Sequence, residues 1–338
     1  MIKSLDTKLE RIRSNPSCKD FILADAKDAD MAFGLAAPGR ESSRGANQAG
    51  YRSLTQYRQS MREIVRQGLV DMMLMSASTS EILTIEERLF DDSPVTPAVR
   101  MNDTTDIWLA QGGAQAGHPS LPFRTATIDH AQCGRYHCEP DERTLGADVG
   151  LYSITFNNDA QRDHATLAAY RDFRLEAESK GFRYFLEVFA PNACDNVAKK
   201  ELPRFVSDCL VRALAGVTKR GRPLFLKMPY FGPAALEELV HYDPTLVVGI
   251  LGGAAGTTLD AFQLLWESKK YGARAALFGR KINIAEDQLA LVRLLRAVAD
   301  DEIEPAEAVR AYHGELQRQN IAPSRSLEED LQQTQKFG

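Results

Sequence analysis

The sequence lacks a long apolar run. No stretch approaches the roughly 20 consecutive apolar residues that a membrane-spanning helix needs. The opening residues, MIKSLDTKLERIRSNPS, carry charges where a signal peptide would need an apolar segment. We therefore expect no membrane partner, and we expect the protein to be cytoplasmic.

The sequence also lacks a surplus of basic residues. Its 41 Lys and Arg residues are outnumbered by 46 Asp and Glu residues, which gives a formal net charge of -5. Proteins that bind a phosphate backbone usually carry a basic surplus or a clustered basic face. Nucleic acid is therefore not an expected partner, although a local cationic pocket is compatible with this charge.

Cysteine is scarce, with five scattered residues among 338. A chain of this length with 44% hydrophobic residues can bury a core without a disulfide framework, so reduced thiols are the expectation. The segment IDHAQCGRYHCEPDE gathers His130, Cys133, His137 and Cys138, but it lacks the paired C-x2-C or H-x3-H spacing of structural zinc sites. No metal site is predicted.

Apolar segments typical of strands alternate with amphipathic segments typical of helices. The pattern is regular from about residue 146 onward and interrupted before it. Strands are expected near residues 21, 70, 98, 149, 184, 224, 246 and 274, and eight is the number that closes a parallel barrel. We predict an α/β protein, a (β/α)8 TIM barrel forming one domain over residues 1–338. An insertion after the third strand is expected at about 109–145, and a polar tail at about 321–338.

The alternative architecture is a doubly wound open sheet. It is disfavoured because no dinucleotide-binding fingerprint follows the first predicted strand.

Polar residues end several otherwise apolar strands. Active sites of such barrels lie at the C-terminal ends of the strands, and alternate strand residues face the same way. On this reasoning Lys227 in RPLFLKMPYFG, Glu187 in FRYFLEVF, and Asp25 with Lys27 in ILADAKDAD point into the barrel. Burying an unpaired lysine is costly, so Lys227 is paired, reaches water or is kept neutral for chemistry.

Each of these residues also has a structural interpretation. Lys227 and Glu187 can form an ion pair without catalysis, and the acidic end of the first strand can be a solvated loop. Asn102 and Asp106, in RMNDTTDIW, either bind substrate, help to fold the insertion or simply form turns.

Two loops with glycine follow the last two predicted strands. GILGGAAGTT places Gly252 and Gly253 before a helix, and LFGRKIN contains Gly279 and Arg280. Loops at these positions, with a helix N-terminus, form a recurrent phosphate site in barrels. We predict phosphate binding there; the alternative is that the glycines only permit tight turns.

Together these segments resemble the class I aldolase superfamily, which contains the archaeal-type fructose-bisphosphate, deoxyribose-phosphate and tagatose-bisphosphate aldolases. LFLKMPYFG, GILGGAAGTTLDAFQLLWESKKYGA and ALFGRKINIAEDQLALVRLL carry the resemblance, which extends from about residue 146 to 300. It implies that Lys227 forms a Schiff base with a sugar phosphate, with Glu187 as the nearby acid and Asp25 as the supporting aspartate. It also assigns Gly252, Gly253, Gly279 and Arg280 to phosphate binding.

The resemblance implies no cofactor, because the iminium replaces a metal as the electron sink. A homo-oligomer and a small phosphorylated sugar are the expected assembly and partner. Several family members carry a second lysine on the fourth strand, in a pattern like G-A-D-A-V-K, where this chain reads GADVGLY and has Leu151. Lys27 and Tyr152 are the candidates to replace that lysine.

Three functions stay open at the level of the sequence. The first is aldol cleavage or formation on a phosphorylated ketose. The second is a Schiff-base transferase, transaldolase-like or acyl-transferring, and the third is a barrel that binds a sugar phosphate without catalysis.

Overall fold

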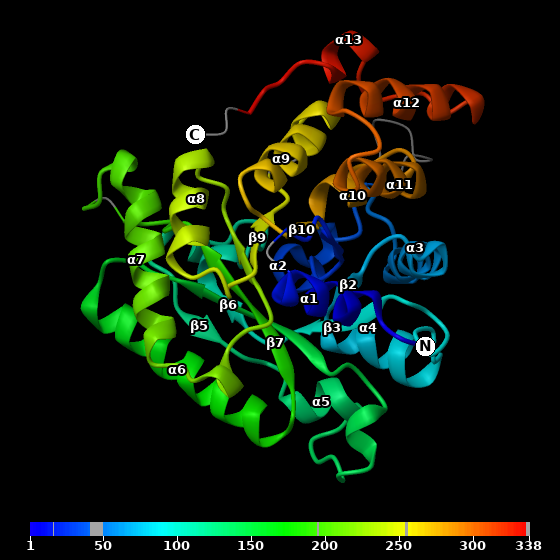
Figure 1. Ribbon diagram of the computed structural model, residues 1–338. Helices are drawn as coiled ribbons and strands as arrows, with labels where there is room; N and C mark the ends of the chain where they lie inside the picture. The colour runs from blue at the N-terminus through cyan, green and yellow to red at the C-terminus, as the bar shows by residue number, and fades with distance from the viewer. Residues whose placement is uncertain (16, 41–49, 195, 254–255, 336–338) are drawn as a thin grey trace.

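Eight parallel strands close into a barrel, so the predicted (β/α)8 TIM barrel is confirmed (Figure 1). The computed structural model describes residues 1–15, 17–40, 50–194, 196–253 and 256–335. Parallel strands buried on both faces are expected to be continuously apolar, and β2 illustrates this with the sequence MMLM, all buried. In order around the barrel the strands are β1 (Ile22–Ala26), β2 (Met72–Met75), β3 (Thr96–Arg100), β6 (Val149–Thr155), β7 (Arg183–Phe189), β8 (Leu226–Met228), β9 (Val248–Leu251) and β10 (Ala275–Phe278).

Helices cover the outside of the barrel. The longer helix between β1 and β2 is α3 (Leu54–Gln67). A capping box at Ser53 and Gln56 begins it, and Gly68, in the left-handed conformation, ends it. Helices also lie in the other connections between strands. The helices between strands are α2 (Asp30–Phe33), α3 (Leu54–Gln67), α4 (Ala77–Ser80), α6 (Ala160–Ser179), α7 (Leu202–Ala215), α8 (Pro233–Tyr242) and α9 (Thr258–Lys270).

After β10 the chain forms a C-terminal helical group on one side of the barrel (Figure 1). It consists of α10 (Arg280–Ile284), α11 (Gln288–Ala299), α12 (Pro305–Arg318) and α13 (Leu327–Asp330). A segment without regular structure follows α13, and its described part ends at Gln335.

The barrel has two apolar cores, one inside the strands and one between the strands and the helices. Leu23, Met73 and Val99 belong to the outer core. Their sequence neighbours face the interior, because successive strand residues point to opposite sides. The interior strand residues are Ile22, Ala24, Met72, Leu74, Ala98, Val149, Leu151, Phe185, Ala275 and Leu277, joined by Phe225 directly before β8.

The N-terminal helix α1 (Ser4–Ser14) closes the bottom of the barrel. Leu5 and Leu9 are buried and pack with the interior core. Lys8 fixes the helix by donating to the carbonyl of Phe21 (3.0 Å) and to Asp71 (2.9 Å). The open end of the barrel is therefore the opposite one, where the strands end.

The segment between β3 and β6 contains a small antiparallel pair, β4 (Asp103–Thr104) and β5 (Pro122–Phe123), and the short helix α5 (Ile128–Cys133). Asp106 accepts hydrogen bonds from Ser120 Oγ (2.9 Å) and Thr155 Oγ1 (2.8 Å). Asn102 bonds to both backbone groups of Ser153. Both side chains thus attach this segment to β6.

Three further observations bear on the sequence predictions. Cys133 and Cys138 form a disulfide, so the expectation of reduced thiols is wrong for this pair. The bond also removes both thiolates from the metal hypothesis, and no described group of three His, Cys, Asp or Glu side chains is arranged to hold a metal ion. Among the described helices, none combines the length and apolar character required to cross a bilayer.

Candidate active site

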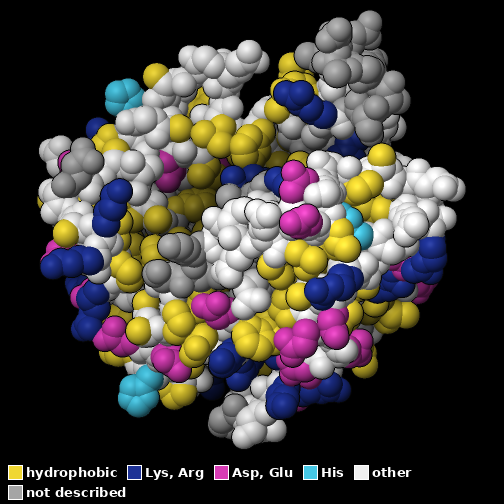
Figure 2. Space-filling view, turned by 90° about the horizontal axis from the view of Figure 1, so that it is seen from above, with side chains coloured by type: hydrophobic (Ala, Val, Ile, Leu, Met, Phe, Trp, Pro, Cys, Tyr) yellow, Lys and Arg dark blue, Asp and Glu magenta, His cyan; other side chains and the backbone are white. Residues whose placement is uncertain are grey.

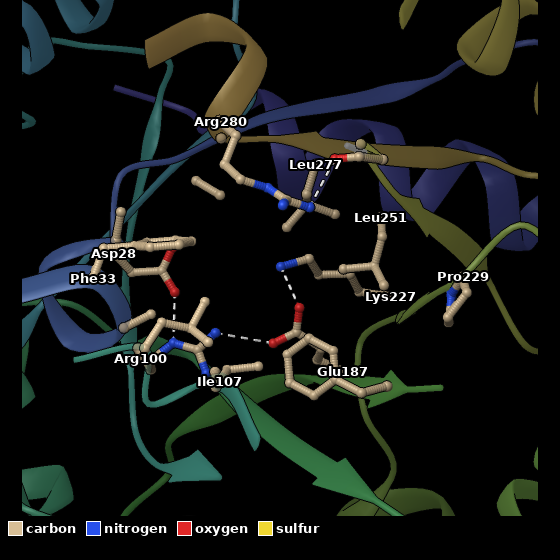
Figure 3. Close-up of a pocket in the computed structure, with 18 of the residues that line it drawn as sticks. Asp28, Phe33, Arg100, Ile107, Glu187, Lys227, Pro229, Leu251, Leu277 and Arg280 are labelled. Carbon is tan, nitrogen blue, oxygen red and sulfur yellow. Dashed lines mark hydrogen bonds and ion pairs between the residues drawn. The ribbon is translucent and has the colours of Figure 1, made fainter. Parts of the chain in front are cut away.

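Lys227 and Glu187 meet inside the open end of the barrel (Figure 3). Phe225 is an interior residue, so Lys227, two positions later on β8, also faces inward. Glu187 is its direct neighbour in the register between β7 and β8. The Lys227 Nζ atom lies 2.5 Å from Glu187 Oε1, and both side chains are buried. The structure therefore brings together the two predicted strand-end residues.

The second carboxylate oxygen of Glu187 is held by two further side chains. Ser153 donates from Oγ to Glu187 Oε2 at 2.6 Å, and Arg100 donates from Nη2 to the same oxygen at 3.1 Å. Ser153 is the register partner of Glu187 on β6, and Arg100 is the last residue of β3. With one oxygen fixed in this way, the other is directed at Lys227.

Arg100 is the centre of a buried charge cluster that the sequence analysis did not identify. Its Nε lies 2.6 Å from Asp28 Oδ2, and its Nη1 lies 3.5 Å from Asp103 Oδ1. Burial lowers the pKa of Arg100, but the carboxylates of Asp28, Glu187 and Asp103 outweigh it and hold that pKa above its ordinary value. A guanidinium group surrounded by carboxylates stays protonated, so Arg100 supplies a permanent positive charge beside Glu187.

The carboxylates around Arg100 differ in their proton affinity. Burial raises the pKa of Asp28, but the charges of Arg100 and Lys227 outweigh it and bring that pKa below its ordinary value. Burial raises the pKa of Asp103 to about 7, because Asp28 and Glu187 add to the effect and Arg100 only partly opposes it. Asp28 is therefore the ionised partner of Arg100.

Asp25 and Lys27 do not face the barrel interior, so that part of the prediction is wrong. Ile22 and Ala24 are the interior residues of β1, and Asp25 and Lys27 have the opposite parity. Lys27 Nζ lies 3.4 Å from Asp25 Oδ2 and 2.9 Å from Gln288 Oε1 of α11, on the helix side of the barrel. Neither residue lines the cavity at the open end.

Burial favours the neutral forms of this pair. It raises the pKa of Asp25 to about 6, against the charge of Lys27, and it lowers the pKa of Lys27. Asp28, at the end of the same strand, is the acidic residue that reaches the interior (Figure 3).

The two fourth-strand residues considered in the sequence, Leu151 and Tyr152, lie outside the charged cluster. Leu151 belongs to the interior core below the charged groups. Tyr152 points outward and stacks on Phe173 of α6 with ring centroids 4.4 Å apart. The second cation beside Glu187 is Arg100, whose guanidinium keeps its proton.

The predicted glycine loops line the same cavity. Gly252, Gly253, Gly279 and Arg280 all border it, and Arg280 Nη2 donates to the carbonyl of Gly253 at 3.1 Å. A Cβ atom at Gly252 would lie 2.7 Å from the carbonyl oxygen of Leu277, so this position requires glycine for close approach of the backbones. The structure places all four residues together.

The N-terminus of α9 is occupied by residues of the C-terminal segment. The backbone N–H of Thr258 donates to Asp330 at 2.6 Å, and Asp330 also bonds to His313 Nε2 at 3.0 Å. Asp260 accepts from the backbone N–H groups of Thr334 (2.8 Å) and Gln335 (3.0 Å). This helix end, which the sequence analysis offered to a phosphate, already has a carboxylate partner.

The cavity at the open end has a volume of about 530 Å³. That size suits a small metabolite. Its floor carries Lys227, Glu187, Arg100 and Asp28, and Arg280 extends over it from the rim (Figure 3). Gln335, which the sequence analysis left in a polar tail, forms part of its wall.

Comparison with known proteins identifies solved structures with a similar fold. No family model matches the chain, and no curated protein matches it. Solved structures do match: the chain is similar to an archaeal fructose 1,6-bisphosphate aldolase (TM-score 0.57, 16% identity, 88% of this chain and 99% of that chain). It is also similar to a fructose-bisphosphate aldolase from Slackia heliotrinireducens (TM-score 0.64, 14% identity, 95% of this chain and 92% of that chain).

A third similar structure is an archaeal fructose-1,6-bisphosphate aldolase with its catalytic lysine covalently bound to the carbinolamine intermediate of the substrate (TM-score 0.58, 17% identity, 88% of this chain and 99% of that chain). At these identities the likeness is one of fold. The chain has the fold of Schiff-base-forming aldolases, in agreement with the resemblance read from its sequence.

Proposed function

We propose that this protein is a class I aldolase in which Lys227 forms a Schiff base with a phosphorylated ketose or a related carbonyl phosphate. The observation that carries the proposal is the 2.5 Å contact between Lys227 Nζ and Glu187 Oε1 at the open end of the barrel. A purely structural ion pair does not need to lie in a cavity of metabolite size, whereas a nucleophile does.

The chemistry follows from the two residues. Only a neutral amine attacks a carbonyl, and Glu187 is placed to take the ammonium proton of Lys227. The attack gives a carbinolamine, and Glu187 returns a proton to the hydroxyl group that leaves as water. The resulting iminium accepts the electrons of the breaking carbon–carbon bond and becomes an enamine, while a base takes the proton of the substrate hydroxyl.

Arg280 and the surrounding backbone supply the anion site. Arg280 is exposed at the rim, next to Gly253 and Gly279. A guanidinium group with free N–H donors suits a phosphate. This arrangement would hold the phosphate while the carbonyl reaches Lys227 (Figure 3).

Covalent trapping tests the proposal. The protein is incubated with dihydroxyacetone phosphate or fructose 1,6-bisphosphate and sodium borohydride, and the intact mass and peptide map are measured. We expect one reduced adduct at Lys227, its loss in Lys227→Ala, and no change in the control Lys199→Ala, which alters an exposed lysine. Absence of an adduct, or adducts spread over surface lysines, would contradict the proposal, and saturable binding without an adduct would favour a non-catalytic barrel.

A further inference from the structure

We propose that the cavity selects a ligand with one anionic group and a largely apolar body, in preference to a fully hydroxylated sugar bisphosphate. This inference deepens the proposed function, on which it rests for the carbonyl that reacts with Lys227. Three features of the described residues carry it: the balance of charges, the composition of the walls and the engagement of the polar groups.

The charges leave one cation for an anionic ligand. The described cations that line the cavity are Arg100, Lys227 and Arg280. Arg100 is compensated by Asp28 and Glu187, at 2.6 and 3.1 Å. Lys227 is paired with Glu187 and is the proposed nucleophile. Arg280 has no carboxylate partner among the described residues, so one anionic group is matched and a second is not.

The walls between the charged floor and the rim are mostly apolar, with Tyr230 and Gln335 as polar side chains among them. The face seen from above is hollowed, and apolar side chains gather in the hollow (Figure 2). Leu251 and Leu277 lie between Lys227 and Arg280 in the close-up (Figure 3). The apolar wall is completed by Phe33, Ile107, Phe189 and Pro229.

The polar groups at the floor are already engaged with one another. Arg100 donates to Asp28, to the carbonyl of Asn102, to Ser153 and to Glu187. The hydroxyl of Tyr230, on the wall, donates to Glu267 at 3.0 Å. Most hydroxyl groups along a ligand would therefore lose hydration without gaining matched partners, which is unfavourable. Methylene groups in the same positions gain from burial.

Three ligands without a carbonyl group test this inference independently of the Schiff base. Hexyl phosphate, sorbitol 6-phosphate and sorbitol 1,6-bisphosphate share a six-carbon chain and differ in hydroxyl groups and in charge. Binding is measured by titration calorimetry with the full chain. We expect hexyl phosphate to bind at least about tenfold more tightly than either sorbitol derivative.

Substitutions in the cavity wall test which residues cause the preference for hexyl phosphate. Phe189→Asn, or Ile107→Thr if the first variant folds poorly, should reduce the preference for hexyl phosphate to about threefold or less. Leu175→Asn, on the exposed side of α6, is the matched control and should leave it unchanged. Arg280→Gln should weaken the binding of hexyl phosphate and of sorbitol 6-phosphate alike, by about tenfold.

The outcomes separate the two proposals. Equal or tighter binding of a sorbitol phosphate, an unchanged preference in the wall variants, or no binding of any probe would overturn the inference. Failure of dihydroxyacetone phosphate, which carries one phosphate and a single hydroxyl group, to give an adduct at Lys227 while hexyl phosphate still binds selectively would instead remove the aldolase proposal and leave the ligand class standing.

Discussion

Glu187 Oε1 lies 2.5 Å from Lys227 Nζ, and the opposite oxygen of the same carboxylate is held by Ser153 and Arg100. The acid therefore has one oxygen for positioning and one for proton transfer. Four neighbouring strands supply this arrangement. Ser153, Glu187 and Lys227 are successive partners across β6, β7 and β8, and Arg100 ends β3, which pairs with β6. Rigid strands, and not loops, set the geometry of the proposed nucleophile.

Replacing the acid should slow the chemistry more than it weakens binding. In Glu187→Gln the proton acceptor beside Lys227 is lost, so trapping of the Schiff base should slow by about 10²- to 10⁴-fold. Affinity for a phosphate ligand at Arg280 should change little. Borohydride trapping at a series of reaction times measures the rate of Schiff-base formation, and calorimetry measures the affinity for the phosphate ligand. The exposed Glu63→Gln is the control for both. An unchanged trapping rate would show that Glu187 transfers no proton.

Removing the buried guanidinium should destabilise the fold strongly. Arg100→Met leaves Asp28, Asp103 and Glu187 without their shared partner, so the free energy of unfolding should fall by about 3–5 kcal/mol. The control Arg62→Met breaks a surface pair with Glu87 and should cost about 1 kcal/mol or less. Urea denaturation followed by circular dichroism gives both values, and equal losses would contradict the central role of Arg100.

The Asp25–Lys27 pair should contribute a pH dependence of stability. The pKa of Asp25 is raised by burial to about 6, so the folded state holds a proton that the unfolded state releases near the ordinary pKa of 3.8. This contribution is fully present below pH 3.8 and is lost as the pH rises through about 6, by about 3 kcal/mol.

In Asp25→Asn the side chain stays neutral, so stability should fall less between pH 4 and pH 7 than in the parent protein. Asp103, whose pKa is raised to about 7, titrates in both proteins and cancels in the comparison. Urea denaturation at several pH values tests this, with the exposed Asp172→Asn as the control; parallel curves for parent and variant would refute the assignment.

Gln335 should tune ligand affinity from the C-terminal segment. Its side chain lines the cavity while Asp260 holds its backbone N–H at 3.0 Å. Gln335→Ala should raise the Kd of hexyl phosphate by about fivefold, the effect of one net hydrogen bond, with little change in Tm. The neighbouring exposed Gln332→Ala serves as the control. Equal Kd values for the two variants would remove Gln335 from the binding surface.

The barrel and two of its charged residues could be predicted from the sequence because strands buried on both faces form continuous apolar runs. Lys227 and Glu187 interrupt such runs, and burying them requires the partners that the structure shows. The same property explains the error at β1. Leu23 and Ala24 are both apolar and both buried, so nothing in the alternation distinguishes inside from outside.

The rest of the site depends on residues distant in sequence. Arg100 lies in a buried strand, just as Lys227 does, and Asp103 is near it in sequence, but its closer carboxylate partners come from positions 28 and 187. Gln335 lies in a polar segment that is held by Asp260 and Thr257 at the start of α9. Pairings of this kind arise from the closure of the barrel and the return of the chain over it, and local patterns do not encode them.

The plug formed by α1 has a kinetic consequence. With Leu5 and Leu9 sealing one end of the barrel, whatever reaches Lys227 must enter and leave through the opposite opening. For the proposed reaction, the fragment freed by bond cleavage must depart through that opening while the other fragment is still tethered to the lysine. Product release should therefore be ordered, with the untethered fragment leaving first.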